Sequence, residues 1–519
     1  MFIHKQNNPI LYYNGKIYGS PFASAILCKD GKILSIGKRE DFNIQNIVDL
    51  QGGFVYPGFI DSHLHLLGVG QAIENVNLIG LKSPYEAIKI LGEFDCQNEN
   101  IAWILGRGWD QTLWDNQTFP NKNILDKGTN CPVAFRRVDG HALWVNSRAM
   151  EIAGVSPDTQ SPHGGIIIKN KKGEPTGIFI DNAMNLILDV IPKPGSSVIK
   201  RQLQKAITHL NLLGLTSVHD PGTDPDTISI LKKKSFNSTL DVYAMLNYKE
   251  KEIAPFLSEG PLINDSLLTV RAIKIYLDGA LGSRGAALLE AYSDDSKNHG
   301  LIIENVEKVK KDIRRFNKLG FQTAIHCIGD RANRIALDIY EKGGGKLCRN
   351  RIEHAQIIHK NDISRFAKLG VLPCMQTVHC TSDMNWIHSR LGKNKLSEAY
   401  PWNSLIQTGT IIPGGSDAPI ESANPLKGIY AAITRKDEEG NPPGGWQKQE
   451  TISRNNAIKM YTEWAAYAAF EEKSKGKIQE GFNGDFTVLS KDLLAVHPRE
   501  ILDNKVKMTI VNGKVVYSA

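Results

Sequence analysis

The alternation of apolar and polar residues changes twice along the chain, and its two ends have the same character. Near the N-terminus, ILYYNGKIYG, SAILCKDGKILSIG and GFVYPG are short alternating segments with Asn-Gly and Asp-Gly steps, which are typical of β-hairpins. The C-terminal segments GDFTVLS and VKMTIVNGKVVYS repeat this pattern. Residues 1–55 and 468–519 are therefore predicted to form one small composite β-sandwich domain.

Between these ends, residues 56–467 alternate short apolar runs with helical segments. Helical segments such as 198–214, 305–320 and 360–370 finish at a glycine, which is a helix C-cap signal. Repeated β and α units over this length predict an α/β fold, a (β/α)8 TIM-like barrel. An open doubly wound sheet is the alternative, but the sequence lacks its Gly-rich phosphate loop. The strands are predicted to end near Asp61, Arg137, His219, Leu277, His326, His354, Gln376 and Ser416.

One stretch, at about 70–210, is too long for a single connection between a barrel strand and its helix. It contains PVAFRRVDGHALWVN and a predicted hairpin within HGGIIIKNKKGEPTGIFIDNA. We expect an inserted α/β subdomain here.

Histidine and aspartate side chains stand at several of the predicted strand ends. The run VYPGFIDSHLH places His63 and His65 two residues apart, so that both point to one side of an extended strand end. FQTAIHCIGD, NRIEHAQII and GTIIPGGSDAPI place His326, His354 and Asp417 in the same setting. Each of these residues alone is more often an ordinary core or loop residue. Together, imidazole and carboxylate groups at the carboxyl ends of barrel strands predict a divalent metal site, with zinc as the first candidate.

Composition excludes several other classes of function. The 519 residues are 41% hydrophobic and 23% charged, as in a soluble globular protein, and the net charge is only +7. No Lys/Arg run with interleaved aromatics and no 18-residue apolar run occurs, so neither nucleic acid nor a membrane is an expected partner. Seven cysteines without a CxxC pair exclude a disulfide framework and a thiolate zinc site. With no signal pattern at the N-terminus, we expect a cytoplasmic location.

These motifs resemble the amidohydrolase superfamily of metal-dependent hydrolases. IKIYLDGALGSRGAAL, TAIHCIGDRAN, RIEHAQII and SDAPIESANPLKGIYAAITR are similar to its YtcJ-like branch, which includes N-substituted formamide deformylases. The likeness runs from about residue 10 to the C-terminus, and it implies the same barrel with a composite β domain. It also implies a small-molecule substrate and one or two divalent ions per chain. Members are often dimers or tetramers, so a homodimer is the expected assembly.

The resemblance also implies a ligand set. His63, His65 and Asp417 would hold the more buried metal, and His326 and His354 the more exposed one. Lys274, within an otherwise apolar strand pattern, matches in order a fourth-strand lysine that many binuclear members carboxylate to bridge two metals. Two alternatives stay open: a lysine that pairs with Asp278 or reaches solvent, and a single-metal site in which Lys274 is structural. Asp417 would act as general base and then general acid for a metal-bound hydroxide.

Weaker signals mark further residues at the predicted barrel mouth. His379, after the seventh strand, could donate a hydrogen bond to the developing oxyanion and so be catalytic, or be an ordinary loop histidine. A substrate-binding role is predicted, against packing, capping or loop roles, for His141, Asp139, Arg284, Trp109 and Asp383.

The leading hypothesis is hydrolysis of a C–N bond in a small non-peptide amide, such as an N-substituted formamide. A mononuclear deaminase and an ester or lactone hydrolase use the same type of site, and they remain alternatives. The non-enzyme alternative is a catalytically dead scaffold, which predicts lost ligands, whereas all expected ligand types are present.

Overall fold

The computed structural model describes residues 8–97, 102–138, 140, 142–162, 165–265, 267–343 and 345–519. Its chain divides into two compact units. One unit combines residues 1–66 with 206–519, and the other comprises residues 67–205.

A parallel barrel forms the centre of the first unit. Eight strands pair in parallel in the order β7 (Phe59–Asp61), β14 (Leu215–Thr223), β15 (Asp241–Asn247), β17 (Leu268–Tyr276), β18 (Gln322–Cys327), β19 (Arg351–His354), β20 (Leu372–Gln376) and β21 (Gly414–Gly415). A short strand, β16 (Leu262–Asp265), pairs antiparallel with β17. The two ends of the series meet where the Ser62 N–H donates to the Gly414 carbonyl at 2.9 Å. The predicted TIM-like α/β barrel is confirmed.

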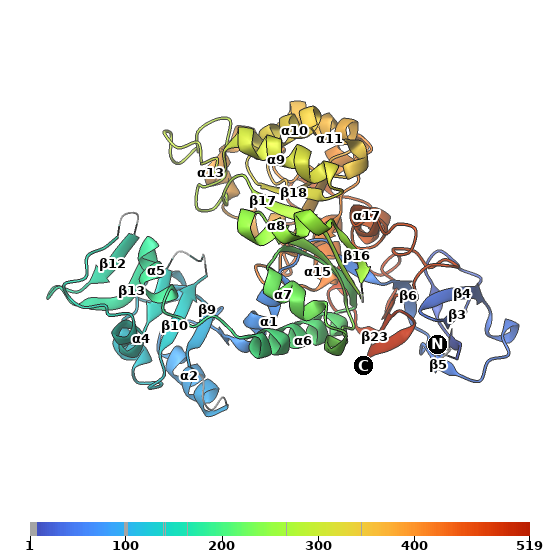
Figure 1. Ribbon diagram of the computed structural model, residues 1–519, viewed down its shortest axis with the longest axis horizontal. Coiled ribbons are helices and arrows are strands. Elements are labelled where there is room, and N and C mark those ends of the chain that lie inside the picture. The colour runs from blue at the N-terminus through green and yellow to red at the C-terminus, as the bar shows by residue number, and fades with distance from the viewer. Residues whose placement is uncertain are drawn as a thin grey trace. The chain divides into compact units, whose positions relative to one another are not determined.

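Helices follow the strands along the chain and cover the barrel (Figure 1). In α9 (Val306–Lys318), Val309, Ile313 and Phe316 recur at helical spacing and are buried. Lys311, Arg314 and Arg315, which lie between them in sequence, are exposed. Both α9 and α10 (Asp330–Gly343) pack against β18. The other helices of this unit are α7 (Pro225–Leu231), α8 (Glu250–Glu259), α11 (Ile363–Leu369), α12 (Thr377–Asp383), α13 (Ile387–Leu391), α14 (Trp402–Gln407), α15 (Pro425–Thr434), α16 (Arg454–Met460) and α17 (Glu463–Ala468). None of the described helices is long and apolar enough to cross a membrane.

One strand prediction was wrong. The segment ending at Arg137 is a strand, β10 (Val133–Arg137), but it pairs with β9 and β11 of the second unit and not with the barrel. The third barrel strand is instead β15, whose residues Asp241 to Leu246 are all buried. His219 therefore lies on the second barrel strand, while Lys274 still lies on the fourth. Local pattern predicted β10 as a strand but did not single out β15, and hydrogen-bond partners far along the chain decide which sheet a strand joins.

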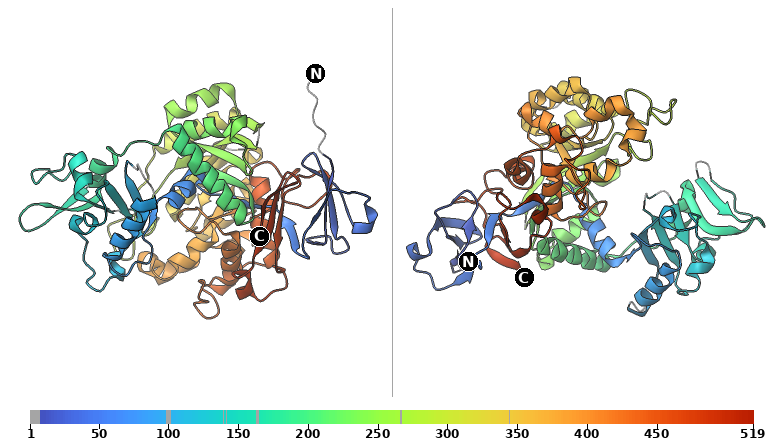
Figure 2. Two further views of the ribbon diagram at one scale, coloured as in Figure 1. Left: turned by 90° about the horizontal axis from the view of Figure 1, so that it is seen from below. Right: turned by 180° about the vertical axis from the view of Figure 1, so that it is seen from behind.

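The termini form two stacked sheets (Figure 2). One contains β4 (Lys32–Gly37), β3 (Ala25–Lys29), β1 (Ile10–Tyr13) and β5 (Ile47–Asp49). The other joins N-terminal β2 (Lys16–Ile17) and β6 (Phe54–Pro57) to C-terminal β22 (Phe486–Leu489), β23 (Val506–Val511) and β24 (Lys514–Ser518). Apolar residues from both termini share one core, and the Tyr12 hydroxyl donates to the Gly513 carbonyl at 2.8 Å.

The second unit is built on a six-stranded sheet. Its order is β12 (Gly165–Lys169), β13 (Pro175–Asp181), β11 (Ala142–Val145), β10, β9 (Ile104–Trp109) and β8 (Val76–Asn77). The helices of this stretch are α1 (Leu66–Glu74), α2 (Glu86–Gln97), α3 (Lys122–Leu125), α4 (Ser147–Ile152), α5 (Asn185–Leu188) and α6 (Ser196–Leu212), the last of which continues into the first unit. Large aromatic side chains, among them Trp109, Trp114, Phe135 and Trp144, fill its core.

Candidate metal centre

The two histidines of the HxH motif follow directly after the first barrel strand. β7 ends at Asp61, and the Asp61 carboxylate accepts a hydrogen bond from the His63 N–H at 3.0 Å. The His63 side chain is fully buried, whereas that of His65 is 34% exposed. Both Nε2 atoms turn toward Asp417: Oδ1 of this carboxylate lies 3.4 Å from His63 and 3.2 Å from His65.

Asp417 reaches this position from the last barrel strand. Its N–H donates to the His63 carbonyl at 2.7 Å, and its φ of +59° is a left-handed conformation that few aspartates adopt. Burial by itself favours the neutral acid, but the imidazoles of His63 and His65 hold the pKa of Asp417 well below its usual range. The group is therefore a carboxylate at neutral pH, able to act as a metal ligand or as a base.

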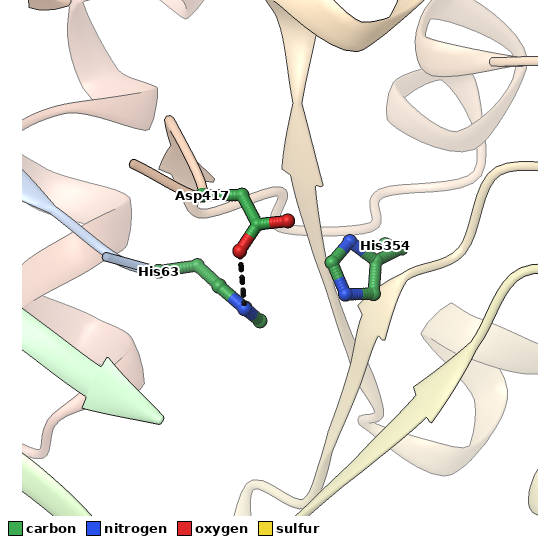
Figure 3. Close-up of side chains that lie close together, drawn as sticks. All are labelled: His63, His354 and Asp417. Carbon is green, nitrogen blue, oxygen red and sulfur yellow. Dashed lines mark ion pairs between the residues drawn. The ribbon is translucent and has the colours of Figure 1, made fainter. Parts of the chain in front are cut away.

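His326 and His354 approach from the fifth and sixth strands. The His354 ring lies 4.8 Å from that of His63 and 4.5 Å from that of His326, centroid to centroid. Burial and the Lys274 ammonium lower the pKa of His326 to about 3, and burial together with His326 lowers that of His354. Both imidazoles are therefore neutral at physiological pH. Figure 3 shows His63, His354 and Asp417 converging from three segments of the chain.

Buried polar side chains set the orientation of two of these imidazoles. His63 Nδ1 forms a short contact with the Glu353 carboxylate, and His354 Nδ1 lies 2.8 Å from Gln376 Oε1. The Gln376 amide nitrogen donates to the Cys374 carbonyl, which fixes the amide so that its oxygen faces His354. Both rings consequently carry a proton on Nδ1 and leave Nε2 as the nitrogen that can bind a metal, as in most metal-binding histidines.

Lys274 lies on β17 and is 1% exposed. Burial lowers the pKa of its ammonium group, against the opposing effect of the Glu353 and Asp417 carboxylates. Its Nζ lies 4.7 Å from the centre of the Tyr276 ring, and no ion pair to it occurs among the described residues. The alternative in which Asp278 pairs with Lys274 is wrong, because the Asp278 carboxylate accepts the N–H groups of Ala287, Ile328 and Gly329.

The side chains present fit a divalent cation. Ligand atoms of His63, His354 and Asp417 all lie within 4.8 Å of one another. Among the residues that the structure describes, the buried Nε2 atoms of His63 and His326 have no hydrogen-bond partner, which is costly unless another ligand satisfies them. Neutral imidazoles around a carboxylate are the donor set that zinc and its first-row neighbours prefer.

Comparison with known proteins agrees with this chemistry. A sequence model described as "Amidohydrolase family" matches residues 46–517. The chain belongs to the amidohydrolase family.

Relatives of this amidohydrolase cover almost its whole length. The YtcJ protein of Bacillus subtilis (strain 168) is 34% identical over 95% of this chain and 96% of its own. The N-substituted formamide deformylase of Arthrobacter pascens is 24% identical, with 95% of both chains covered. A crystal structure of an uncharacterized metal-dependent hydrolase from Pyrococcus horikoshii OT3 superposes with a TM-score of 0.80 at 26% identity, covering 95% of this chain and 99% of the other. The predicted YtcJ-like branch is confirmed.

His379, on α12 after the seventh strand, faces the amidohydrolase's candidate metal ligands. Its Nε2 lies 3.8 Å from Asp417 Oδ2, and its Nδ1 lies 3.3 Å from the Gln356 amide nitrogen. If Gln356 donates to Nδ1, the His379 proton resides on Nε2, where it can be donated to a substrate. On the same helix, Asp383 accepts a hydrogen bond from the Tyr400 hydroxyl at 2.5 Å, and burial raises the pKa of Asp383 to about 6.

The other residues predicted to contact the substrate are not seen beside the candidate metal ligands. Trp109 is fully buried in the core of the second unit and its indole N–H donates to the Phe135 carbonyl, so the prediction of a substrate-binding role is corrected to packing. Arg284 follows β17, but its guanidinium is engaged by two hydrogen bonds to Asp294, at 3.0 and 2.9 Å. Asp139 and His141 lie outside the described residues. The residues next to them in sequence belong to the second unit. The prediction that a barrel strand ends near Arg137 had placed them at the barrel mouth.

Three residues near the candidate metal ligands were not predicted from the sequence to belong to the site. Glu353 and Arg351 were not recognised, although two charged residues in alternate positions of an apolar strand are a detectable signal. Tyr276 was also missed: it is 38% exposed, and its ring lies 5.4 Å from that of His326. Burial and the Asp417 carboxylate raise the pKa of Tyr276 to about 12, so its hydroxyl remains a hydrogen-bond donor at neutral pH.

Proposed function

We propose that this amidohydrolase cleaves a C–N bond in a small non-peptide amide, with N-substituted formamides and N-acyl amines as the first substrates to test. The observation that carries the proposal is the position of the Asp417 carboxylate. Its Oδ1 faces Nε2 of His63 and His65, whereas its Oδ2 faces His379. One oxygen can therefore hold a cation while the other remains free to accept a proton.

The cation, for which we propose zinc, would be held by His63, His65, His326, His354 and Asp417, with Lys274 as a bridging ligand if it is carboxylated. When bound, a divalent cation lowers the pKa of a water molecule from about 15.7 toward 7 and polarises a carbonyl group. The buried, low-pKa lysine supports carboxylation, because only the neutral amine reacts with CO2.

Two side chains of the protein would carry out the proton transfer and stabilise the developing negative charge. Asp417 Oδ2 accepts the proton of the attacking water and returns it to the leaving nitrogen, acting as general base and then general acid. The N–H of His379 donates to the carbonyl oxygen as negative charge develops on it. The amine product leaves neutral because it receives the proton that the water lost.

The name of the Arthrobacter pascens relative supports a formamide-type substrate for this chain. A second candidate, a mononuclear deaminase, is favoured by one observation. The ligand atoms that lie within 4.8 Å of one another belong to His63, His354 and Asp417, which is enough for one cation. Ester or lactone hydrolysis is the third, since the same groups can act on either type of carbonyl.

A substrate panel with matched leaving groups tests the proposal. Zinc-loaded protein is offered N-alkyl and N-aryl formamides, the corresponding acetamides, the corresponding esters, and aminopurines, with free amine, alcohol or ammonia measured. Amine release that Asp417→Asn abolishes is the expected result. Ammonia release from the purines alone, cleavage of esters alone, or amine release that Asp417→Asn leaves intact would each overturn it.

A further inference from the structure

Arg351, the first residue of β19, is a fully buried arginine whose three guanidinium nitrogens all have partners. Its Nε donates to Glu353 Oε1 at 2.7 Å, and one terminal nitrogen donates to Oε2 at 3.2 Å. That same nitrogen donates to the Ser62 carbonyl at 2.6 Å, and the other lies 3.0 Å from His219 Nδ1. The guanidinium therefore cannot turn without breaking several bonds at once.

Glu353 is held between Arg351 and His63. Both of its oxygens bind the guanidinium, and Oε2 also contacts His63 Nδ1. A carboxylate is only an acceptor, so His63 must place its proton on Nδ1. Nε2 of His63 is then the nitrogen available to a cation; it lies 3.4 Å from Asp417 Oδ1 and has no hydrogen-bond partner among the described residues.

Arg351 also binds the backbone next to His63. Ser62 immediately precedes His63, and its carbonyl is bound by the nitrogen that also binds Glu353. One planar group thus holds both the backbone that carries the imidazole and the carboxylate that orients it. Only the fork of arginine offers donors in this arrangement, and lysine would offer a single mobile nitrogen.

Stability is a poor explanation for this arrangement. Buried ion pairs often contribute little net stability, because desolvation of both charges offsets their attraction. Barrel interiors are usually filled by branched apolar residues, which would pack the same space without charge.

We propose that Arg351 and Glu353 are positioning residues that fix the ring and tautomer of His63 for a divalent cation. The inference rests on the metal dependence of the family and on the ligand role of His63 given under the proposed function. Neither residue touches the substrate or the cation; both act through His63.

The test measures zinc affinity and not activity alone. Metal-free Glu353→Gln and Arg351→Lys proteins are titrated with zinc against a chelator, and their Tm is recorded without metal. The matched controls are Glu472→Gln and Arg349→Lys, because Arg349 forms a two-bond pair with Glu472 at 2.8 Å for each bond. We expect zinc affinity to fall by about 10- to 100-fold in Glu353→Gln and by about 10-fold in Arg351→Lys, with the controls unchanged.

A lowered Tm with wild-type zinc affinity in the folded variants would show a purely structural role and overturn the inference. If neither variant folds, NMR of the imidazole nitrogens of zinc-loaded wild-type protein decides: metal on His63 Nε2 with a proton on Nδ1 supports it, and metal on Nδ1 overturns it. Weaker zinc binding in the variants without any amide cleavage by the wild type would refute the proposed function alone. Amide cleavage with unchanged zinc affinity in the variants would refute this inference alone.

Discussion

Gly415 lies so close to His63 that no side chain fits between them. A Cβ atom at Gly415 would stand 2.6 Å from the His63 backbone nitrogen, and 2.9 Å from both the His63 Cβ and an oxygen of Asp61. The last barrel strand can approach the first only because this residue is glycine, and this approach carries Asp417 to the metal ligands.

Gly415→Ala is therefore expected to separate β21 from β7. Overpacking of this kind costs about 1–3 kcal/mol of stability, and the bound zinc per chain should fall because Asp417 moves with the strand. Thermal unfolding and elemental analysis measure the two effects. Gly92→Ala is the control, since no atom of the described residues lies within 4 Å of a Cβ there, and equal behaviour of the two variants would refute the packing argument.

Asp417→Asn should abolish turnover with the fold retained. The amide keeps the size of the carboxylate but cannot accept and return a proton, so kcat should fall by at least about 10²-fold. Single-turnover kinetics and a Tm close to wild type are the measurements. Asp294→Asn, which alters an acid paired with Arg284, should leave kcat within a fewfold of wild type.

Lys274 is expected to determine how many cations the site holds. If the lysine is carboxylated and bridging, protein prepared with bicarbonate binds about two cations per chain and Lys274→Gln binds about one. Elemental analysis with and without bicarbonate measures this. Equal metal content in the wild type and the variant would assign Lys274 a structural role and favour the mononuclear alternative.

Tyr276→Phe removes the hydroxyl that lies beside the metal ligands and keeps the ring. Because the phenol is protonated at neutral pH and partly exposed, we expect it to donate to the substrate. The variant should lose about 10-fold in kcat/KM, the equivalent of one hydrogen bond, with unchanged metal content. Wild-type kinetics would exclude the hydroxyl from substrate contact.

The contribution of Glu471 to stability should fall as pH rises from about 4.3 to about 7. Burial raises the pKa of Glu471 to about 7, although both of its oxygens lie 3.0 Å from Lys475 Nζ. In the unfolded chain a glutamate titrates near pH ~4.3, so between these values the folded protein binds the additional proton. Stability from this group is full below the unfolded pKa and declines, by up to about 4 kcal/mol, as pH rises through the folded pKa.

Urea unfolding at several pH values measures that decline. Glu471→Gln should flatten it, because the amide does not titrate. Glu472→Gln should leave the decline in place, since Arg349 lowers rather than raises the pKa of Glu472. A Glu471→Gln protein with the wild-type slope would assign the decline to other groups.

The sequence alone determined the barrel class and the strand-end positions of five candidate metal ligands. His63 and His65 follow an apolar strand at a spacing of two, and His326, His354 and Asp417 end strands of their own, so local period and strand ends were sufficient. The glycine pair before Asp417 can also be seen in the sequence, in GTIIPGGSDAPI. The sequence does not show that Gly415 must be glycine because it packs against His63.

Only the tertiary structure decided what depends on contacts between distant segments. It assigned β10 to the second unit and β15 to the barrel, because a strand joins a sheet through partners far away in the chain. It showed that Trp109 is buried in a hydrophobic core and that the Arg284 guanidinium is hydrogen-bonded to Asp294. It also brought Glu353 to His63, 290 residues away, because residues this far apart in sequence meet only when the barrel closes.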